Sequence, residues 1–153
     1  MTGRPEPGCF SCEQDRRDDL PPRERVWVTE HWRVAHAFDS ALPGWLVVLP
    51  RRHAVAIAEL RPEEAAQLGP MLIDVSRALA VVTGCLKTYV LQLAEAEGFA
   101  HVHFHVIPRA AGLPDDVRGP RVFSLMGRPV GERVAEDEQD RLALALATQL
   151  ERQ

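Results

Sequence analysis

The feature that most constrains this chain is a short run in which histidines alternate with apolar residues. His101, His103 and His105 are each separated by a single apolar residue. Side chains at every second position of a β-strand share one face, so the three imidazoles would line up about 6–7 Å apart. The intervening residues would point the other way, into a core: Val102, Phe104 and Val106. The run therefore predicts a strand over residues 100–107.

The rest of the chain has the periodicities of an α+β domain. Further strands are predicted over four segments: residues 25–28, 31–38, 45–49 and 87–93. Residues 61–83 carry an apolar stripe at helical spacing, in which Pro70 is expected to cause a kink or a late start. Residues 136–151 predict a terminal helix. Because the strands occur in adjacent pairs without crossover helices between them, the sheet is expected to be mainly antiparallel.

The length of 153 residues fits one domain, and no linker divides the chain. We expect a single unit over residues 1–153, with its core in residues 23–109. Residues 1–22 read as a polar lead-in around a cysteine pair, and residues 111–131, rich in glycine and proline, read as a long surface loop.

Charge and hydropathy exclude several classes of protein. The formal net charge of −4 argues against a general nucleic-acid binder, which needs a basic face. No apolar run approaches the roughly 18 residues needed to span a bilayer, so no membrane partner is expected. Residues 1–10 carry no signal-peptide pattern, and a cytoplasmic location is expected.

Three aligned imidazoles allow several chemistries. They could form a solvated strand face or a metal site, but the metallo-β-lactamase pattern H-x-H-x-D-H needs an Asp with an adjacent histidine, and the chain, with Phe104 and Val106 flanking His105, does not match it. An amidohydrolase barrel needs about 250 residues, more than this chain has. The remaining reading is nucleophilic, because a neutral imidazole can attack phosphorus near pH 7 while its neighbours stabilise the phosphate oxygens.

Cys9 and Cys12 have the two-residue gap that lets both thiolates reach one tetrahedral zinc ion. Such a site needs two more ligands from elsewhere in the chain. A reduced, exposed pair is the alternative, whereas a redox pair is disfavoured because the motif does not lie between a strand and a helix.

Three segments together resemble the histidine-triad (HIT) family, in its zinc-binding form with an N-terminal C-x-x-C. Residues 101–109 match the family signature of three alternating histidines followed by Pro-Arg. Residues 42–53 resemble its P-G-H-x-L-V-x-P-K-x-H segment, and residues 9–12 its optional C-x-F-C. The resemblance implies an α+β fold, a mainly antiparallel sheet with one long helix and a C-terminal helix, usually paired into a homodimer.

The resemblance also implies an activity on small-molecule nucleotides. A family member hydrolyses or transfers at an α-phosphate, on substrates such as dinucleoside polyphosphates or nucleoside phosphoramidates, and requires no catalytic metal. In this chain His103 would attack the phosphorus and carry a covalent nucleotidyl intermediate. His105 would contact the phosphate oxygens. His101 would not touch the substrate but would support the other two histidines.

Further binding residues follow from the same resemblance. A structural zinc ion would be held by four side chains: Cys9, Cys12, His53 and His101. Asp39 resembles the acidic residue that holds the ribose hydroxyls. Gly98 is expected to offer a backbone N–H to the nucleotide, and Arg109 is the first of the cations expected to attract its phosphates.

The chain departs from the family pattern at two places. Trp45 stands where the family has a histidine, so the role of that histidine is expected to be lost. Residues 94–100 replace the stretch that usually grips phosphate. These departures keep open a nucleotide-binding sensor or partner protein with little catalysis. A DNA-end repair enzyme is disfavoured, since the chain is acidic and has no basic or zinc-finger appendage after the triad.

Overall fold

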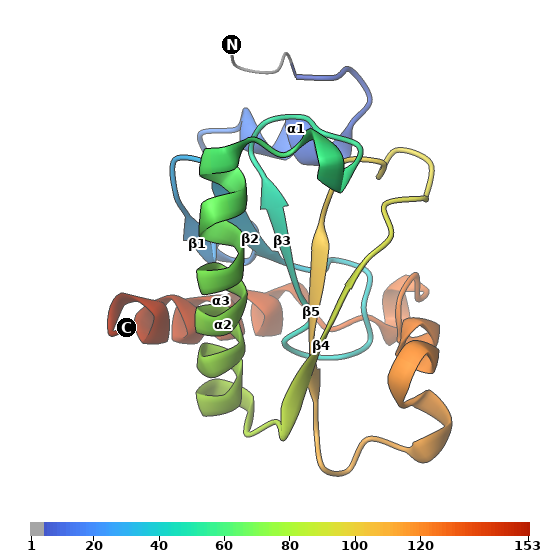
Figure 1. Ribbon diagram of the computed structural model, residues 1–153. Coiled ribbons are helices and arrows are strands. Elements are labelled where there is room, and N and C mark those ends of the chain that lie inside the picture. The colour runs from blue at the N-terminus through green and yellow to red at the C-terminus, as the bar shows by residue number, and fades with distance from the viewer. Residues whose placement is uncertain (1–4) are drawn as a thin grey trace.

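The computed structural model describes residues 5–153, so the first four residues of the predicted lead-in lie outside the described part (Figure 1). The five strands form one fully antiparallel sheet in the order β1-β2-β3-β5-β4. Their bounds are β1 Trp27–Val28, β2 Trp32–His36, β3 Leu46–Pro50, β4 Lys87–Gln92 and β5 Phe104–Arg109. The predicted fold class, α+β with a mainly antiparallel sheet, is confirmed.

Two long helices cover one face of this sheet. Helix α2 (Pro62–Thr83) and helix α3 (Glu136–Glu151) match the predicted segments closely. Between helices and sheet lies the main core, which is built from alternate residues of the strands and the apolar stripes of the helices. Its central members are Trp32, Val34, Leu46, Val48, Val75, Leu79, Val102, Phe104, Val106 and Leu146. The inward orientation predicted for the apolar residues of the histidine run is therefore confirmed.

Helix α2 runs without interruption through Pro70, so the expected late start is wrong. Gly69 and Pro70 are exposed, and so is Ala66, whose backbone carbonyl Pro70 leaves without an N–H donor, so water can bind that carbonyl. The helix start is secured by Glu64, whose carboxylate accepts the N–H of Arg61 at 2.8 Å.

By length and composition alone, α2 is also apolar enough to cross a membrane. This corrects the expectation that no segment reaches that length. The core helix of a soluble protein passes the same test, and Met71, Val75 and Leu79 of α2 are buried in the main core.

The segment over residues 111–131 is not a plain surface loop as predicted. It holds three short 3₁₀ helices, η3 (Asp115–Val117), η4 (Gly119–Leu125) and η5 (Val130–Glu132). Val122 of η4 is fully buried in a second apolar cluster with Ala37, Trp45 and Ile107, on the face of the sheet away from the main core. Four apolar residues of this segment make the packing: Val122, Phe123, Leu125 and Met126. The sequence pattern does not reveal them, because glycines and prolines surround them.

Two other predicted boundaries change. Strand β5 begins at Phe104, not residue 100, because pairing with β3 ends at Val48 opposite Phe104. The carbonyl of Pro50, at the end of β3, instead accepts a hydrogen bond from the His101 ring. The predicted lead-in also contains a short helix, α1 (Phe10–Asp15), which lies across one end of the sheet (Figure 1).

Candidate active site and metal centre

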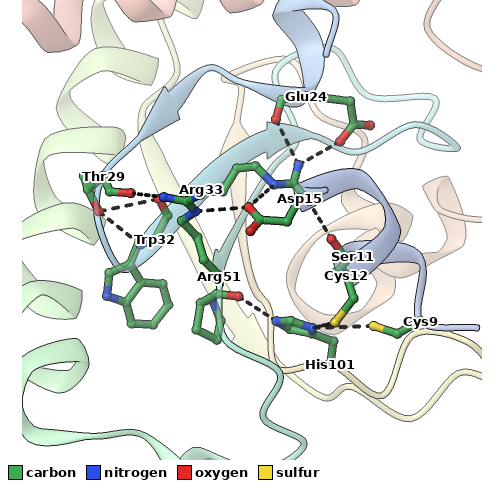
Figure 2. A network of polar contacts seen from close by, with 11 residues as sticks. Cys9, Ser11, Cys12, Asp15, Glu24, Thr29, Trp32, Arg33, Arg51 and His101 are labelled. Atoms are coloured by element: carbon green, nitrogen blue, oxygen red, sulfur yellow. Dashed lines mark hydrogen bonds and ion pairs between the residues drawn. The ribbon is translucent and has the colours of Figure 1, made fainter. Parts of the chain in front are cut away.

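The four side chains expected to hold zinc come together at the junction of α1, the end of β3 and the start of the histidine run. One ligand atom from each of Cys9, Cys12, His53 and His101 lies within 4.8 Å of all the others. His101 Nδ1 is 3.5 Å from Cys9 Sγ and 3.6 Å from Cys12 Sγ (Figure 2). His53 Nδ1 is 3.4 Å from Cys12 Sγ.

These separations fit a tetrahedral zinc ion. Zn–S bonds of about 2.3 Å and Zn–N bonds of about 2.0–2.1 Å at tetrahedral angles place sulfur and nitrogen about 3.5 Å apart. His101 Nε2 donates to the Pro50 carbonyl at 2.6 Å, which leaves Nδ1 free to bind a metal. Burial, with Cys9 alongside, raises the pKa of Cys12 to about 11, and a bound cation would reverse this by stabilising the thiolate. The cluster can hold a structural zinc ion.

The other two histidines of the run face away from this cluster. The rings of His103 and His105 lie 4.7 Å apart, centroid to centroid, with their planes nearly perpendicular. His103 Nδ1 donates to the backbone carbonyl of His101 at 2.8 Å, so a neutral His103 ring keeps its lone pair on Nε2. His101 thus has two contacts of different kinds: its ring lies in the metal cluster, and its backbone carbonyl accepts the hydrogen bond from His103.

His105 is buried among aromatic rings. The indole N–H of Trp45 donates to His105 Nδ1 at 3.0 Å. Trp45 replaces the histidine of the family pattern, yet its side chain still contacts the triad. Phe123 of η4 packs edge-on against His105, with ring centroids 5.0 Å apart. Burial, together with the nearby His103, lowers the pKa of His105 to about 3, which keeps the ring neutral.

A cavity of about 360 Å³ opens beside His103 and His105, within the size range of small-molecule sites. Asp39 lies in the lining of this cavity, and its predicted contact with the ribose hydroxyls stays a prediction. Its wall includes three aromatic rings that the sequence reasoning missed: Phe10, Phe38 and Phe99. Their centroids lie 5.1–5.9 Å apart, although they come from α1, the turn after β2 and the loop before the triad. No local pattern joins these three positions, so only the fold could show them.

A buried arginine connects the cavity to α1. Arg33 is only 2% exposed, and its Nη1 donates to both the carbonyl and the carboxylate of Glu24 at 2.9 Å. Its Nη2 reaches the Ser11 carbonyl at 3.5 Å, and its Nε lies 3.8 Å from the Asp15 carboxylate (Figure 2). Ser11 also lines the cavity, so the helix that carries Cys12 is fixed to the cavity wall.

Two predicted nucleotide-binding residues are not brought to this cavity. Arg109 lies four residues beyond His105 on β5, about 13 Å along the strand, and donates to the Ala110 carbonyl. Gly98 lies outside the cavity lining, and its carbonyl accepts the Phe10 N–H at 3.4 Å. Both residues are close to the triad in sequence, but the direction of β5 and the path of the loop place them away from the cavity.

The chain belongs to the HIT family: the HIT domain model matches residues 21–112. Similar solved structures include a histidine triad protein from Bradyrhizobium japonicum, with 28% identity, coverage of 82% of this chain and 89% of that one, and a TM-score of 0.67. A Zn-bound histidine triad family protein from Mycobacterium smegmatis has 21% identity, coverage of 94% and 96%, and a TM-score of 0.68. No curated protein is similar enough to count as a match. Family membership supports a nucleotide-related hydrolase or transferase activity in general.

The lowered pKa of His105 predicts a loss of stability in acid. Its folded value of about 3 lies below the ordinary 6.5, so the stabilisation is complete above pH 6.5 and is lost as the pH falls toward 3. Between about pH 7.5 and pH 5 this one group removes about 2 kcal/mol. Urea unfolding of His105→Gln is therefore expected to show a pH-dependent loss smaller by that amount than the wild type. Parallel pH profiles for the two proteins would contradict the buried, neutral state of His105.

Proposed function

We propose that this protein is a nucleotide hydrolase or nucleotidyl transferase that acts at an α-phosphate through a covalent intermediate on His103. One observation carries the proposal: His103 Nδ1 donates a hydrogen bond to the His101 carbonyl, so Nε2 keeps its lone pair, and the ring lines a nucleotide-sized cavity. His105 lies next to it and can donate to the phosphate oxygens.

In the proposed first step, the lone pair of His103 Nε2 forms a bond to the α-phosphorus. The bond from that phosphorus to the leaving group breaks, and the leaving group departs with the electron pair. In the second step the oxygen of a water molecule, or of another phosphate acceptor, forms a bond to the same phosphorus, and the proton that this oxygen loses passes to the product phosphate or to solvent. The P–N bond then breaks, which restores the neutral His103 ring.

The cavity supplies the binding part of the proposal. The ring cluster of Phe10, Phe38 and Phe99 offers an apolar surface to a nucleobase, and Asp39 offers a carboxylate to the ribose hydroxyls. Zinc, bound by the Cys9 cluster, would supply structural support to this wall and take no part in the chemistry. A cytoplasmic location stays a prediction, supported by the need to keep the zinc-binding thiols reduced.

The test of this function is a substrate panel of dinucleoside polyphosphates and adenylyl phosphoramidate, with products identified by chromatography. Release of a nucleoside monophosphate, or of its transfer product, is expected. The alternative is a sensor that binds nucleotide without turning it over, and the replacement of the phosphate-gripping stretch by residues 94–100 favours it. Micromolar binding in calorimetry, without product over hours, would establish the sensor and reject the enzyme.

We also propose that the protein forms a homodimer through α2 and β4. Strand β4 is an edge of the sheet, and a shallow groove between it and α2 is lined by Ile73, Leu86 and Val90. These side chains are 52%, 64% and 44% exposed. An unpaired edge strand beside exposed apolar side chains is a surface on which a second copy can extend the sheet.

Val90→Asp tests this interface, because a carboxylate at its centre would lose solvation on pairing. The dimer dissociation constant is expected to rise about a hundredfold or more in sedimentation equilibrium. Val130→Asp is the matched control, since Val130 is 78% exposed and lies in η5. A wild type that stays monomeric, or a Val90→Asp dimer as tight as the wild type, would contradict the proposed interface.

A further inference from the structure

Trp45 makes a contact that determines where His105 carries its proton. The Trp45 side chain is fully buried, and its indole N–H points at His105 Nδ1 from 3.0 Å. Indole can only donate a hydrogen bond, so the nitrogen facing it must be an acceptor. A neutral His105 ring therefore carries its single proton on Nε2.

The backbone around Trp45 is built to hold this contact. Gly44 has a φ of +84°, and a Cβ there would come within 3.1 Å of Thr83 and 3.4 Å of Leu79, so only glycine fits the turn. The Gly44 N–H donates to His36 Nε2 at 2.9 Å, and burial lowers the pKa of His36, which keeps it a neutral acceptor. Phe123 packs edge-on against the Trp45 indole, with centroids 5.4 Å apart.

The two rings beside the cavity consequently have opposite hydrogen-bonding character at Nε2. His103 carries a lone pair there, because its Nδ1 donates to the His101 carbonyl. His105 carries a proton there, because its Nδ1 accepts from Trp45. A nucleophile and a hydrogen-bond donor are thus held side by side. The His101 carbonyl determines the proton position on the first ring, and Trp45 determines it on the second.

We propose that Trp45 is a positioning residue that fixes His105 as a hydrogen-bond donor and prevents it from acting as a proton relay. A histidine that gives up its Nε2 proton must take another at Nδ1 to stay neutral, and the indole N–H is too weak an acid to transfer its proton at ordinary pH. His105 therefore stabilises charge on the phosphate without protonating the group that leaves.

This inference rests on the proposed function and narrows its substrate class. Leaving groups that are stable as anions, such as the phosphate chain of a nucleoside polyphosphate, can depart without a proton. Amine and alkoxide leaving groups need one. The geometry therefore favours nucleoside polyphosphates over phosphoramidates and alkyl esters as substrates.

The first test is the tautomer of His105, read from ¹⁵N shifts of the ring nitrogens in the ligand-free protein. We expect a ¹⁵N shift typical of an unprotonated, pyridine-like nitrogen for Nδ1 and of a protonated, pyrrole-like nitrogen for Nε2. The two signals are assigned to His105 because they disappear in His105→Gln. Trp45→Phe should mix the two tautomers, whereas Trp27→Phe should not, because the Trp27 side chain makes no hydrogen bond within residues 5–153. A protonated Nδ1 in the wild type would overturn the inference while leaving the His103 chemistry untouched.

The second test is kinetic and uses aryl esters of a nucleoside monophosphate with leaving groups of graded basicity. In the wild type, kcat/KM is expected to fall steeply as the leaving group becomes more basic. Trp45→His, which offers a second titratable ring behind His105, should flatten this dependence, and thermal unfolding would confirm that the variant is folded. Equal dependence in a folded Trp45→His and the wild type would overturn the inference. If His103→Ala also turned over the esters, the proposed function would fail instead.

Discussion

Replacing His103 with alanine is expected to lower kcat by about 10³- to 10⁴-fold or more, because the variant lacks the atom that bonds to phosphorus. Nucleotide affinity should change only a few-fold, since His103 is one of many groups that line the cavity. Steady-state product formation measures the first quantity, and isothermal titration calorimetry measures the second.

His31→Ala is the matched control for this prediction. His31 is half-buried in the turn before β2, and its side chain makes no hydrogen bond within the described residues. Wild-type turnover is expected in this variant. Turnover in His103→Ala equal to the wild type would mean that another group attacks the substrate.

Removal of the zinc cluster is the second change expected to have a large effect. Cys12→Ala, or treatment of the wild type with a strong chelator, should lower Tm by about 10 °C or more, since the link between α1 and the sheet is worth several kcal/mol. Calorimetry measures the transition, and elemental analysis of the same samples should find about one zinc ion per wild-type chain and little in the variant. Cys85→Ala is the control, because Cys85 is a buried thiol of the main core.

The same change should weaken nucleotide binding. Phe10 lies between the two cysteines of the cluster and contacts both Phe38 and Phe99 in the cavity wall. Loss of the metal releases Phe10 from that wall, so the dissociation constant for a bound nucleotide is expected to rise about tenfold. An unchanged Tm and affinity after complete removal of zinc would show that the cluster supports neither the fold nor the cavity.

The main elements of the fold could be predicted because their periodicities are local. The stripe of α2 and the alternation around His103 each use one face, and the structure buries the expected side in both. The packing of Val122 could not be predicted, because its partners Trp45 and Ile107 lie on distant strands. The effect of Pro70 could not be predicted for a related reason. The free-energy cost of a proline inside a helix depends on whether water can reach the backbone carbonyl that loses its N–H donor.

In the candidate site, too, the residues in sequence motifs could be predicted, and the contacts that depend on the packing of distant strands could not. The four zinc ligands could be named from spacing and family resemblance, and the structure brings all four together. Arg109 was named for its position after the triad, but an extended strand carries it away from the cavity. The contact of Trp45 with His105 was missed because it depends on the pairing of β3 with β5, where Leu46 lies opposite Val106.

The most direct test of the central claim is to trap the covalent intermediate. Protein mixed with a nucleotide substrate is quenched in alkaline denaturant within one turnover and digested, and its peptides are weighed by mass spectrometry. We expect the mass of one nucleoside monophosphate on the peptide that contains His103, lost on exposure to acid and missing from His103→Ala. Turnover of the same substrate with no adduct on any histidine peptide would contradict it.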